Sequence, residues 1–325
     1  MITVHRQVDG RWTAEPVEDL AGFRADAAWI DLDSPGEQER EAFTRATGLV
    51  LPTAHEMEEI EASSRSYEDQ GQLVMTIPVM SAGDTPKPRI SPVTFVLGRE
   101  RIVTLRFTEP KPISMYEERL RQGLIGPTPG ELFFGLLDTF VDRLADILEL
   151  VIARLARISD IVFAQHRSGE LRRHRIARLR VAVREIGQDG RLLSMIRTSL
   201  SAFERALTYI TARQPAVAKS CKDQIKTLQR DIQSLQQQSA FHDDQVQLLL
   251  DATFGLINTE QADVVSLLSI IATIFLPPTL IASIYGMNFA FMPELSWPWG
   301  YPLAIVLILA SALGPLWIFR RKGWL

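Results

Sequence analysis

Two uncharged apolar segments close to the C-terminal end constrain this chain more than any other feature. Residues 264–285 and 301–319 contain no Asp, Glu, Lys or Arg. At about 1.5 Å per residue, their lengths of about 22 and 19 residues suffice to cross a hydrocarbon core of ~30 Å. Two buried helices of a soluble core are the alternative, but both segments exceed the usual ~11–12 residues of a globular helix. We therefore expect two transmembrane helices in a lipid bilayer.

The basic residues after the second segment predict its orientation. Arg320, Arg321 and Lys322 follow it directly, whereas the connecting residues 286–300 contain no Lys or Arg and a single acid, Glu294. Because cytoplasmic flanks are enriched in Lys and Arg, the tail at 320–325 is expected in the cytoplasm. Two spans return the chain to its starting side, so the N-terminal part is expected there too. The first residues lack an apolar stretch with a cleavage site, so no signal peptide is expected.

Composition and missing motifs exclude several functions. Lys and Arg number 35 against 39 Asp and Glu, a net charge of −4, so nucleic acid is not an expected partner. The single cysteine, Cys221, cannot form an intramolecular disulfide or a thiolate metal cluster. Residues 55–59 begin like a zinc-protease helix but lack its second histidine, and no phosphate-binding Gly-rich loop followed by Lys-Ser or Lys-Thr occurs. The chain is therefore not expected to be an enzyme.

Residues 1–125 predict an α/β domain with a mixed sheet flanked by helices. Apolar and β-branched residues indicate strands at 28–32, 72–80, 92–97 and 101–107, the last two joined as a hairpin. Ser34 is expected to cap a helix that has Pro35 at its first position.

Residues 126–263 predict long stalk helices. Apolar residues recur at spacings of three and four over about 128–165 and 171–210, and a third helix opens at Pro215. We expect this third helix to continue for about 70 residues through the first span, or about 105 Å. So long a helix needs partners, either copies of itself or the two preceding helices. The basic run at 171–180 is interpreted as a stalk face or a basic belt near the membrane, with nucleic acid or acidic lipid headgroups as alternatives.

The first span and the residues before it carry a face of small, weakly polar and apolar residues. Two spans cannot enclose a hydrophilic path, so transport through this protein requires an oligomer. The alternative is that small residues merely let helices pack closely. The pore-lining candidates are Asn258, Val265, Leu268, Ala272, Leu276, Thr279 and Ser283.

The segment between the spans, residues 286–300, contains recognisable motifs. Gly286-Met287-Asn288 ends the first span, and Met-Pro-Glu-Leu follows at 292–295. With the Gly-Tyr-Pro start of the second span and the Trp-Leu terminus, this region resembles the CorA family of magnesium transporters. An acidic segment at 58–65 resembles the family more weakly. The resemblance implies a funnel-shaped homopentamer in a prokaryotic plasma (inner) membrane, with five copies of the first span lining a pore.

The chemistry of Mg²⁺ agrees with this resemblance. Mg²⁺ prefers oxygen ligands and keeps its water, so a pore entrance should offer neutral carbonyl oxygens, as Asn288 does. Gly286 is expected to supply an unusual backbone angle at the helix end, and Glu294 to attract cations. Thr279 and Ser283 would continue a hydroxyl path inward. An apolar constriction that gates by excluding water is expected at Leu276, Leu268 and Val265.

The family also implies regulatory Mg²⁺ bound between acidic side chains of neighbouring subunits, which holds the funnel shut until internal Mg²⁺ falls. The sequence offers candidates but does not pair them. They are Glu58, Glu59 and Glu61 in the N-terminal domain, with Asp223, Asp231 and Asp251 on the stalk.

Three functions remain in competition. The first is channel-like uptake of Mg²⁺, with Co²⁺ and Ni²⁺ not excluded. The second is zinc transport, as in another branch of the same superfamily. Zinc prefers nitrogen and sulfur ligands, and His242 is the only His or Cys after Cys221, which favours Mg²⁺. The third is a membrane-tethered sensor or scaffold, for which Asn288→Ala would leave function intact.

Overall fold

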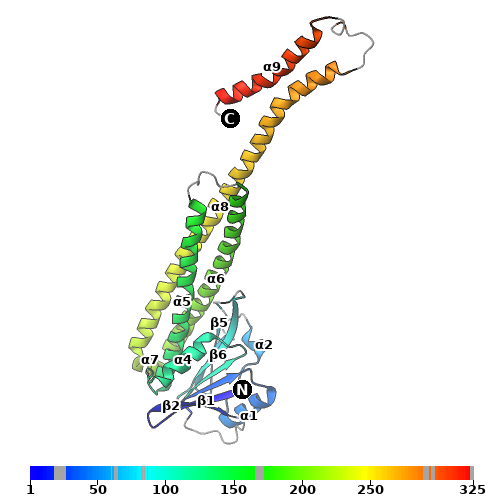
Figure 1. The fold of residues 1–325 in the computed structure, drawn as a ribbon. Coiled ribbons are helices and arrows are strands. Elements are labelled where there is room, and N and C mark those ends of the chain that lie inside the picture. The colour runs from blue at the N-terminus through cyan, green and yellow to red at the C-terminus, as the bar shows by residue number, and fades with distance from the viewer. Residues whose placement is uncertain are drawn as a thin grey trace. The chain divides into compact units, whose positions relative to one another are not determined.

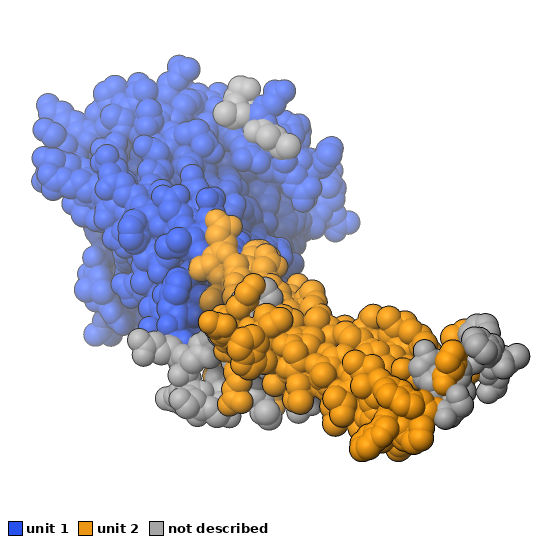
Figure 2. All heavy atoms as spheres, turned by 90° about the horizontal axis from the view of Figure 1, so that it is seen from above, with its two compact units in different colours: residues 1–168, 180–250 blue, residues 169–179, 251–325 orange. Residues whose placement is uncertain are grey.

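The computed structural model describes residues 1–17, 27–59, 61, 65–81, 83, 85, 87–164, 172–287, 293 and 297–322. The chain divides into two compact units, which Figure 2 colours separately. Unit 1 comprises residues 1–168 and 180–250, and unit 2 comprises residues 169–179 and 251–325.

Unit 1 contains a seven-stranded sheet of order β2-β1-β3-β7-β6-β5-β4 (Figure 1). Strands β3 and β7 pair in parallel and all other neighbours are antiparallel, so the expected mixed sheet is confirmed. The expected hairpin is β6 with β7. The strands are β1 (Ile2–Val8), β2 (Arg11–Val17), β3 (Trp29–Asp33), β4 (Ser66–Asp69), β5 (Gln72–Ser81), β6 (Arg89–Leu97) and β7 (Ile102–Arg106).

Two hairpins in this sheet were not expected from the sequence. Between β1 and β2, Asp9 and Gly10 have φ of 50° and 76°, and between β4 and β5, Gln70 and Gly71 have φ of 49° and 75°. Two consecutive residues with positive φ form the tight turn whose twist suits a hairpin, and Asp-Gly is a strong sequence signal for it. The sequence therefore does contain a signal for the first hairpin, namely Asp9-Gly10.

The expected start of the first helix is wrong. Helix α1 (Glu37–Thr47) has Gly36 as its N-cap, and the Glu39 carboxylate accepts a 2.9 Å hydrogen bond from the Gly36 N–H. Ser34 instead lies in the turn that leaves β3, with φ of 47°. Its N–H donates to the Arg106 carbonyl at 2.7 Å, so it is committed to the sheet and does not cap the helix.

Helices cover both faces of the sheet. On one face, Phe43 of α1 and Met57 of α2 (Ala54–Met57) belong to one buried cluster with Ile30, Leu32 and Val103. On the other face lie α4 (Lys111–Arg121) and α5 (Pro129–Phe163). Their aromatic rings meet those of the strands in three contacts: Trp29 with Tyr116, and Phe95 with Phe133 and Phe140.

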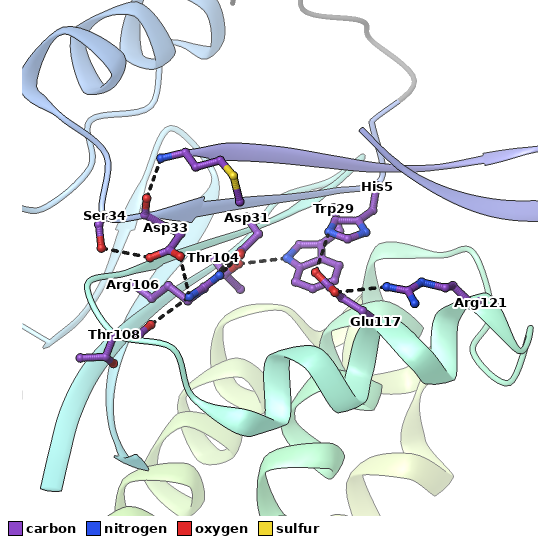
Figure 3. Close-up of polar contacts among 11 residues, drawn as sticks. His5, Trp29, Asp31, Asp33, Ser34, Thr104, Arg106, Thr108, Glu117 and Arg121 are labelled. Atoms are coloured by element: carbon purple, nitrogen blue, oxygen red, sulfur yellow. Dashed lines mark hydrogen bonds and ion pairs between the residues drawn. The ribbon is translucent and has the colours of Figure 1, made fainter. Parts of the chain in front are cut away.

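A buried polar network ties the parallel strands together (Figure 3). The Arg106 guanidinium contacts the Asp31 carboxylate at 2.9 Å and that of Asp33 at 3.1 Å. Thr104 donates to Asp31 and accepts from the Trp29 indole. Because each charge has a close partner, the chain tolerates an ion pair that is nearly inaccessible to water.

Unit 1 continues as a bundle of three helices that run side by side in Figure 1. They are α5, residues 180–213 of α6 (Arg172–Arg213) and residues 222–250 of α8 (Lys222–Tyr285). The Phe140 and Phe203 ring centroids lie 5.9 Å apart. Arg154 reaches the buried Asp189 at 2.6 Å. Gly190 of α6 faces Val246 of α8 so closely that an added Cβ would lie 3.2 Å from it. The two expected stalk helices are thus confirmed as α5 and α6.

The expected single helix from Pro215 is wrong, because a break occurs at Cys221. Helix α7 (Pro215–Ser220) ends there, and α8 begins at Lys222 and has 64 residues. Cys221 is buried with non-helical φ and ψ of −105° and 24°. A Cβ on Gly130 would lie 2.8 Å from its sulfur, so the start of α5 approaches the break closely.

Candidate ion pathway

Two helices are long and apolar enough to cross a membrane by length and composition. They are α8, whose residues 251–285 belong to unit 2, and α9 (Gly300–Arg321) of unit 2. The most apolar window of each has a mean hydropathy of 2.2 and is only 6% buried. Pro277 and Pro278 lie inside α8 without ending it, and Pro315 lies inside α9. Unit 2 therefore presents most of its apolar surface outward, where lipid or further copies of the chain would cover it.

All seven predicted pore-lining residues lie on α8 and are exposed in the single chain. Val265, Leu268 and Leu276 are 63%, 60% and 67% exposed. Residues on other faces of the span, such as Phe275 at 66%, are exposed as well. Exposure in the single chain therefore does not distinguish a pore-lining face of α8 from its other faces. The predicted pore-lining face depends instead on the positions of the polar groups.

The hydroxyl groups of the span bond to their own helix. Thr279 donates to the Phe275 carbonyl, Ser269 to the Val265 carbonyl and Thr273 to the Ser269 carbonyl. A hydroxyl has one donor and two acceptor lone pairs, so these groups keep acceptor capacity. The water molecules around Mg²⁺ point their hydrogens outward and need acceptors. Thr279 is therefore chemically suited to contact a hydrated cation.

The C-terminal end of the first span differs from expectation at Gly286. This glycine is absent from the left-handed backbone region, so the expected unusual angle is wrong. Its N–H donates to the Ala282 carbonyl at 3.0 Å, and an added Cβ would lie only 3.2 Å from that oxygen. Gly286 therefore allows the close last turn of the helix. Met287 follows and is 49% exposed, whereas Asn288 and Glu294 lie outside the described residues.

Asn258 and an ion pair lie just before the uncharged segment of α8. Asn258 is exposed, and it and Asn288 are the only asparagines in the chain. Glu260 is 8% exposed and lies 2.9 Å from Arg175 on the first turns of α6. Since Glu260 precedes the uncharged segment by four residues, this pair lies about 6 Å before the span along the helix axis. Sequence reasoning missed the pair, because spacing along the chain says nothing about which helix faces Glu260.

The regulatory candidates are placed as follows. Glu58, Glu59 and Glu61 are exposed after α2, and Asp223 and Asp231 are exposed on α8 in unit 1, whereas Asp251 belongs to unit 2. Among the described residues, no three His, Cys, Asp or Glu side chains are arranged to hold one metal ion.

One acidic residue near these candidates was not predicted. Asp138 of α5 lines a groove of about 320 Å³ together with Asp223, Gln224 and Thr227 of α8. Burial raises the pKa of Asp138, the Asp142 and Asp231 carboxylates push it the same way, and Arg119 opposes them. The structure thus brings Asp223 and Asp231 to the side of α8 that faces Asp138.

Comparison with known proteins decides the family. The family model for the CorA-like Mg²⁺ transporter protein matches residues 24–321. The chain belongs to this family.

Relatives of this CorA-like chain match it over nearly its whole length. It is 34% identical to the magnesium transport protein CorA of Sodalis glossinidius over 308 residues, 94% of this chain and 95% of the relative. It is 32% identical to the magnesium transport protein CorA of Salmonella typhimurium over 326 residues, which covers 100% of both.

A solved structure shows the same fold. The complete structure of the CorA magnesium transporter from Methanocaldococcus jannaschii matches with a TM-score of 0.77 at 19% identity, covering 100% of this chain and 99% of that one. The predicted family and fold class are thereby confirmed. CorA-like proteins are ion transporters, which also confirms the expectation that the chain is not an enzyme.

Proposed function

We propose that the chain forms a homopentameric channel that takes up Mg²⁺ across the plasma (inner) membrane. Membership of the CorA-like Mg²⁺ transporter family over residues 24–321 carries this proposal. Two observations of the structure support it. The spans are hardly buried in one chain, and the first carries acceptor hydroxyls that suit a hydrated cation.

One chain has too few membrane-spanning helices to enclose a pore, and this supports an oligomer. Two helices leave no enclosed path, and a hydrated ion requires a polar or water-filled route through the bilayer. Five copies of α8 would place the face from Asn258 to Ser283 around one axis. Val265, Leu268 and Leu276 would then form the apolar constriction, which closes by excluding water.

Ion selection is assigned to the outer end, at Gly286, Met287 and Asn288. The Asn288 amide oxygen would accept hydrogen bonds from the water shell of Mg²⁺, which loses its water reluctantly. Glu294 would raise the local cation concentration, an effect that salt screens. Co²⁺ and Ni²⁺ have the same charge as Mg²⁺ and similar hydration, so both ions are expected to pass through the channel as well.

The membrane potential would drive uptake. A divalent ion gains about 4.6 kcal/mol per 100 mV of inside-negative potential. Both termini would lie in the cytoplasm, since Arg320 and Arg321 end α9 and Lys322 follows them. Unit 1 would then contact cytoplasmic Mg²⁺.

Cytoplasmic Mg²⁺ would close the channel by binding acidic side chains at subunit contacts. We assign Asp223 and Asp231 of the stalk to this role together with Asp138, which lies beside them. Glu58, Glu59, Glu61 and Asp251 stay candidates for the partner side of such contacts.

The test is Mg²⁺ flux into liposomes that contain a Mg²⁺-sensitive dye, under an inside-negative potential. We expect Asn288→Ala to abolish selective flux, and Thr279→Ala to reduce it. Ser311→Ala is the matched control, because its hydroxyl lies on α9 and donates to its own backbone.

The outcomes separate the three functions. Zn²⁺ flux without Mg²⁺ flux would indicate a zinc transporter. Absence of flux of either ion from folded, oligomeric protein would indicate a tethered sensor. Equal flux in wild type and Asn288→Ala would remove Asn288 from the selectivity site.

A further inference from the structure

The part of α6 that belongs to unit 1 carries three arginines on its outer side. Arg180, Arg184 and Arg191 are exposed, and their spacing of four and seven residues puts them on one side of the helix. Ile186 and Leu193 lie on the opposite side and are fully buried in the bundle. Among the described residues, no carboxylate forms an ion pair with these three arginines. We call them the basic row.

The outer side of α5 carries the opposite charge. Glu149 and Asp160 are exposed and lie eleven residues, or about three helical turns, apart, so they share one side of the helix. Val151 lies on the opposite side of α5 and is fully buried. Neither carboxylate has an ion-pair partner in the described part of the chain. We call Glu149 and Asp160 the acidic row, and the short side chains of Ala153 and Ala156 are exposed between them.

Two ion pairs inside the bundle show which parts of α5 and α6 lie at the same height along it. Arg154 of α5 contacts Asp189 of α6 at 2.6 Å. About one turn further along α5, Arg157 contacts Glu185 at 3.9 Å, which lies about one turn back along α6. The two helices are therefore antiparallel, and each step forward on α5 matches one step back on α6.

This alignment puts the basic row and the acidic row at the same height. Asp160 is level with the turn between Arg180 and Arg184. Glu149 lies within about 5 Å of the height of Arg191. Each row points away from the buried side of its own helix, so the two rows of one chain do not face each other. Opposite charges thus lie at matching heights on two separate surfaces of one bundle.

A ring of copies would bring these two surfaces together. In a ring, each copy offers one surface to the next copy and a different surface to the previous one. Rotation about an axis along the bundle leaves every residue at its own height, so the basic row of one copy meets the acidic row of the next in register. Gly187, Ala153 and Ala156 are exposed between the charges and leave room for the two helices to approach.

We propose that the basic row of α6 in one copy of this chain binds the acidic row of α5 in the next copy. This inference rests on the proposed homopentamer and names a surface that joins its stalks. Single exposed ion pairs contribute little stability, so the rows act as a set. They orient neighbouring copies head to tail and disfavour the arrangement in which two basic rows meet.

The first experiment joins the two surfaces covalently. Ala156 of α5 and Gly187 of α6 lie at the same height, and an added Cβ on Gly187 meets nothing within 4 Å. The full-length protein with Ala156→Cys and Gly187→Cys is purified in detergent and mildly oxidised. We expect disulfides between neighbouring copies, seen as a ladder of covalent multimers on a denaturing gel. The unsubstituted chain, whose Cys221 is buried, gives the background.

The two single-cysteine variants are the matched controls. In a head-to-tail ring, the cysteine of Ala156→Cys faces Gly187 of the next copy and finds no second thiol, so neither single variant should form a ladder. Absence of the ladder in the double variant would overturn the proposal. Cross-linking of a single variant as efficiently as the double variant would overturn it as well, because equal surfaces would then meet.

The second experiment reverses the charges. Arg180→Glu/Arg184→Glu/Arg191→Glu should raise the monomer fraction several-fold in low salt, measured by light scattering and native mass spectrometry. Glu149→Arg/Asp160→Arg should do the same. A chain that carries both sets is again complementary to its neighbours and should recover the wild-type oligomer. Failure of the combined variant to recover, although it unfolds at the wild-type temperature, would contradict the pairing of the two rows.

The matched control reverses three exposed cations of the sheet domain, Arg11, Lys87 and Arg99. Their replacement by Glu changes the net charge equally and should leave the oligomer intact. The two proposals fail in different ways. A monomeric wild-type protein would contradict the homopentamer and this surface together. A wild-type oligomer that forms no ladder and resists charge reversal would keep the homopentamer and overturn only the contact between α5 and α6.

Discussion

The two units of this chain bury their apolar residues to opposite degrees. In unit 1, large side chains such as Trp29, Tyr116 and Phe203 are fully buried by the sheet and helices of the same chain. In unit 2, Leu276 and Trp317 are 67% and 62% exposed. A large exposed apolar surface marks contact with a membrane or a partner. The comparison shows that unit 1 completes its core within one chain, whereas unit 2 leaves most of its large apolar side chains exposed.

The largest expected effect comes from removing an aromatic ring from the core of unit 1. Phe140 is 2% exposed and its ring contacts Phe95 and Phe203. Phe140→Ala should lower the free energy of unfolding by about 3–5 kcal/mol, through lost burial and the cavity left behind. Denaturant unfolding of the purified chain in detergent, followed by circular dichroism, measures it.

Leu276→Ala is the matched substitution in unit 2. It should leave the unfolding transition of unit 1 in place and instead change ion flux, since its side chain faces no core of its own chain. If Leu276→Ala lowered the free energy of unfolding of unit 1 by several kcal/mol, the two units would not bury their apolar residues independently.

The second effect is a pH dependence that belongs to unit 1. His5 stacks on Trp29 with ring centroids 4.0 Å apart and lies beside Glu117 and Arg121 (Figure 3). Burial lowers the pKa of His5 from 6.5 to about 4, and Arg121 acts in the same direction. The unfolded chain thus binds a proton more readily, so stability is complete above pH 6.5 and is lost as the pH falls toward 4.

The loss from His5 amounts to about 3 kcal/mol at most. His5→Phe keeps the stacking and removes the titration, so its stability should fall less between pH 6.5 and 4. Unfolding at several pH values, compared between the two proteins, isolates His5 from the carboxyl groups. Parallel pH curves would show that His5 does not titrate differently on folding.

The same contrast explains what the sequence predicted well. A span is defined locally, by the absence of charge over about 20 residues, so both spans followed from composition alone. Stalk helices α5 and α6 were likewise evident from periodicity. Residues 2–17 do not alternate regularly between apolar and polar residues, so their hydrophobic pattern does not predict the two strands. The clearest signal for this hairpin is the Asp9-Gly10 pair at its turn.

Contacts between segments that are far apart in the chain could not be predicted from the sequence. The Arg175–Glu260 pair joins residues 85 apart, and the position of Asp138 beside Asp223 depends on how α5 packs on α8. The break at Cys221 lies close to Gly130 of α5, another contact between segments that are far apart in the sequence. The motif at 286–288 identified the family, but its geometry at Gly286 required the backbone.

A third, smaller effect tests whether unit 2 is held by its own contacts. Arg175 and Glu260 form the low-exposure pair. The single substitutions Arg175→Glu and Glu260→Arg should each destabilise unit 2, and the double substitution should restore part of the lost stability. We expect a coupling energy of about 1–2 kcal/mol, as for neighbouring charges with limited exposure. Thermal unfolding in nanodiscs, analysed as a double-mutant cycle, measures the coupling. Strictly additive effects would mean that the pair does not hold α6 to α8.

The smallest effect concerns an ion pair in unit 1 that has the same N–O distance. Arg197 and Asp243 also lie 2.9 Å apart and also join α6 to α8, but their side chains are 50% and 34% exposed. Water competes for both groups, so the coupling energy should be about 0.5 kcal/mol or less and should fall further in high salt. The same cycle with Arg197→Ala and Asp243→Ala measures it. Equal couplings for the two pairs would show that limited exposure does not strengthen the contact beside the span. A larger, salt-resistant coupling for Arg175–Glu260 would show that limited exposure strengthens the ion pair beside the span relative to the exposed pair in unit 1.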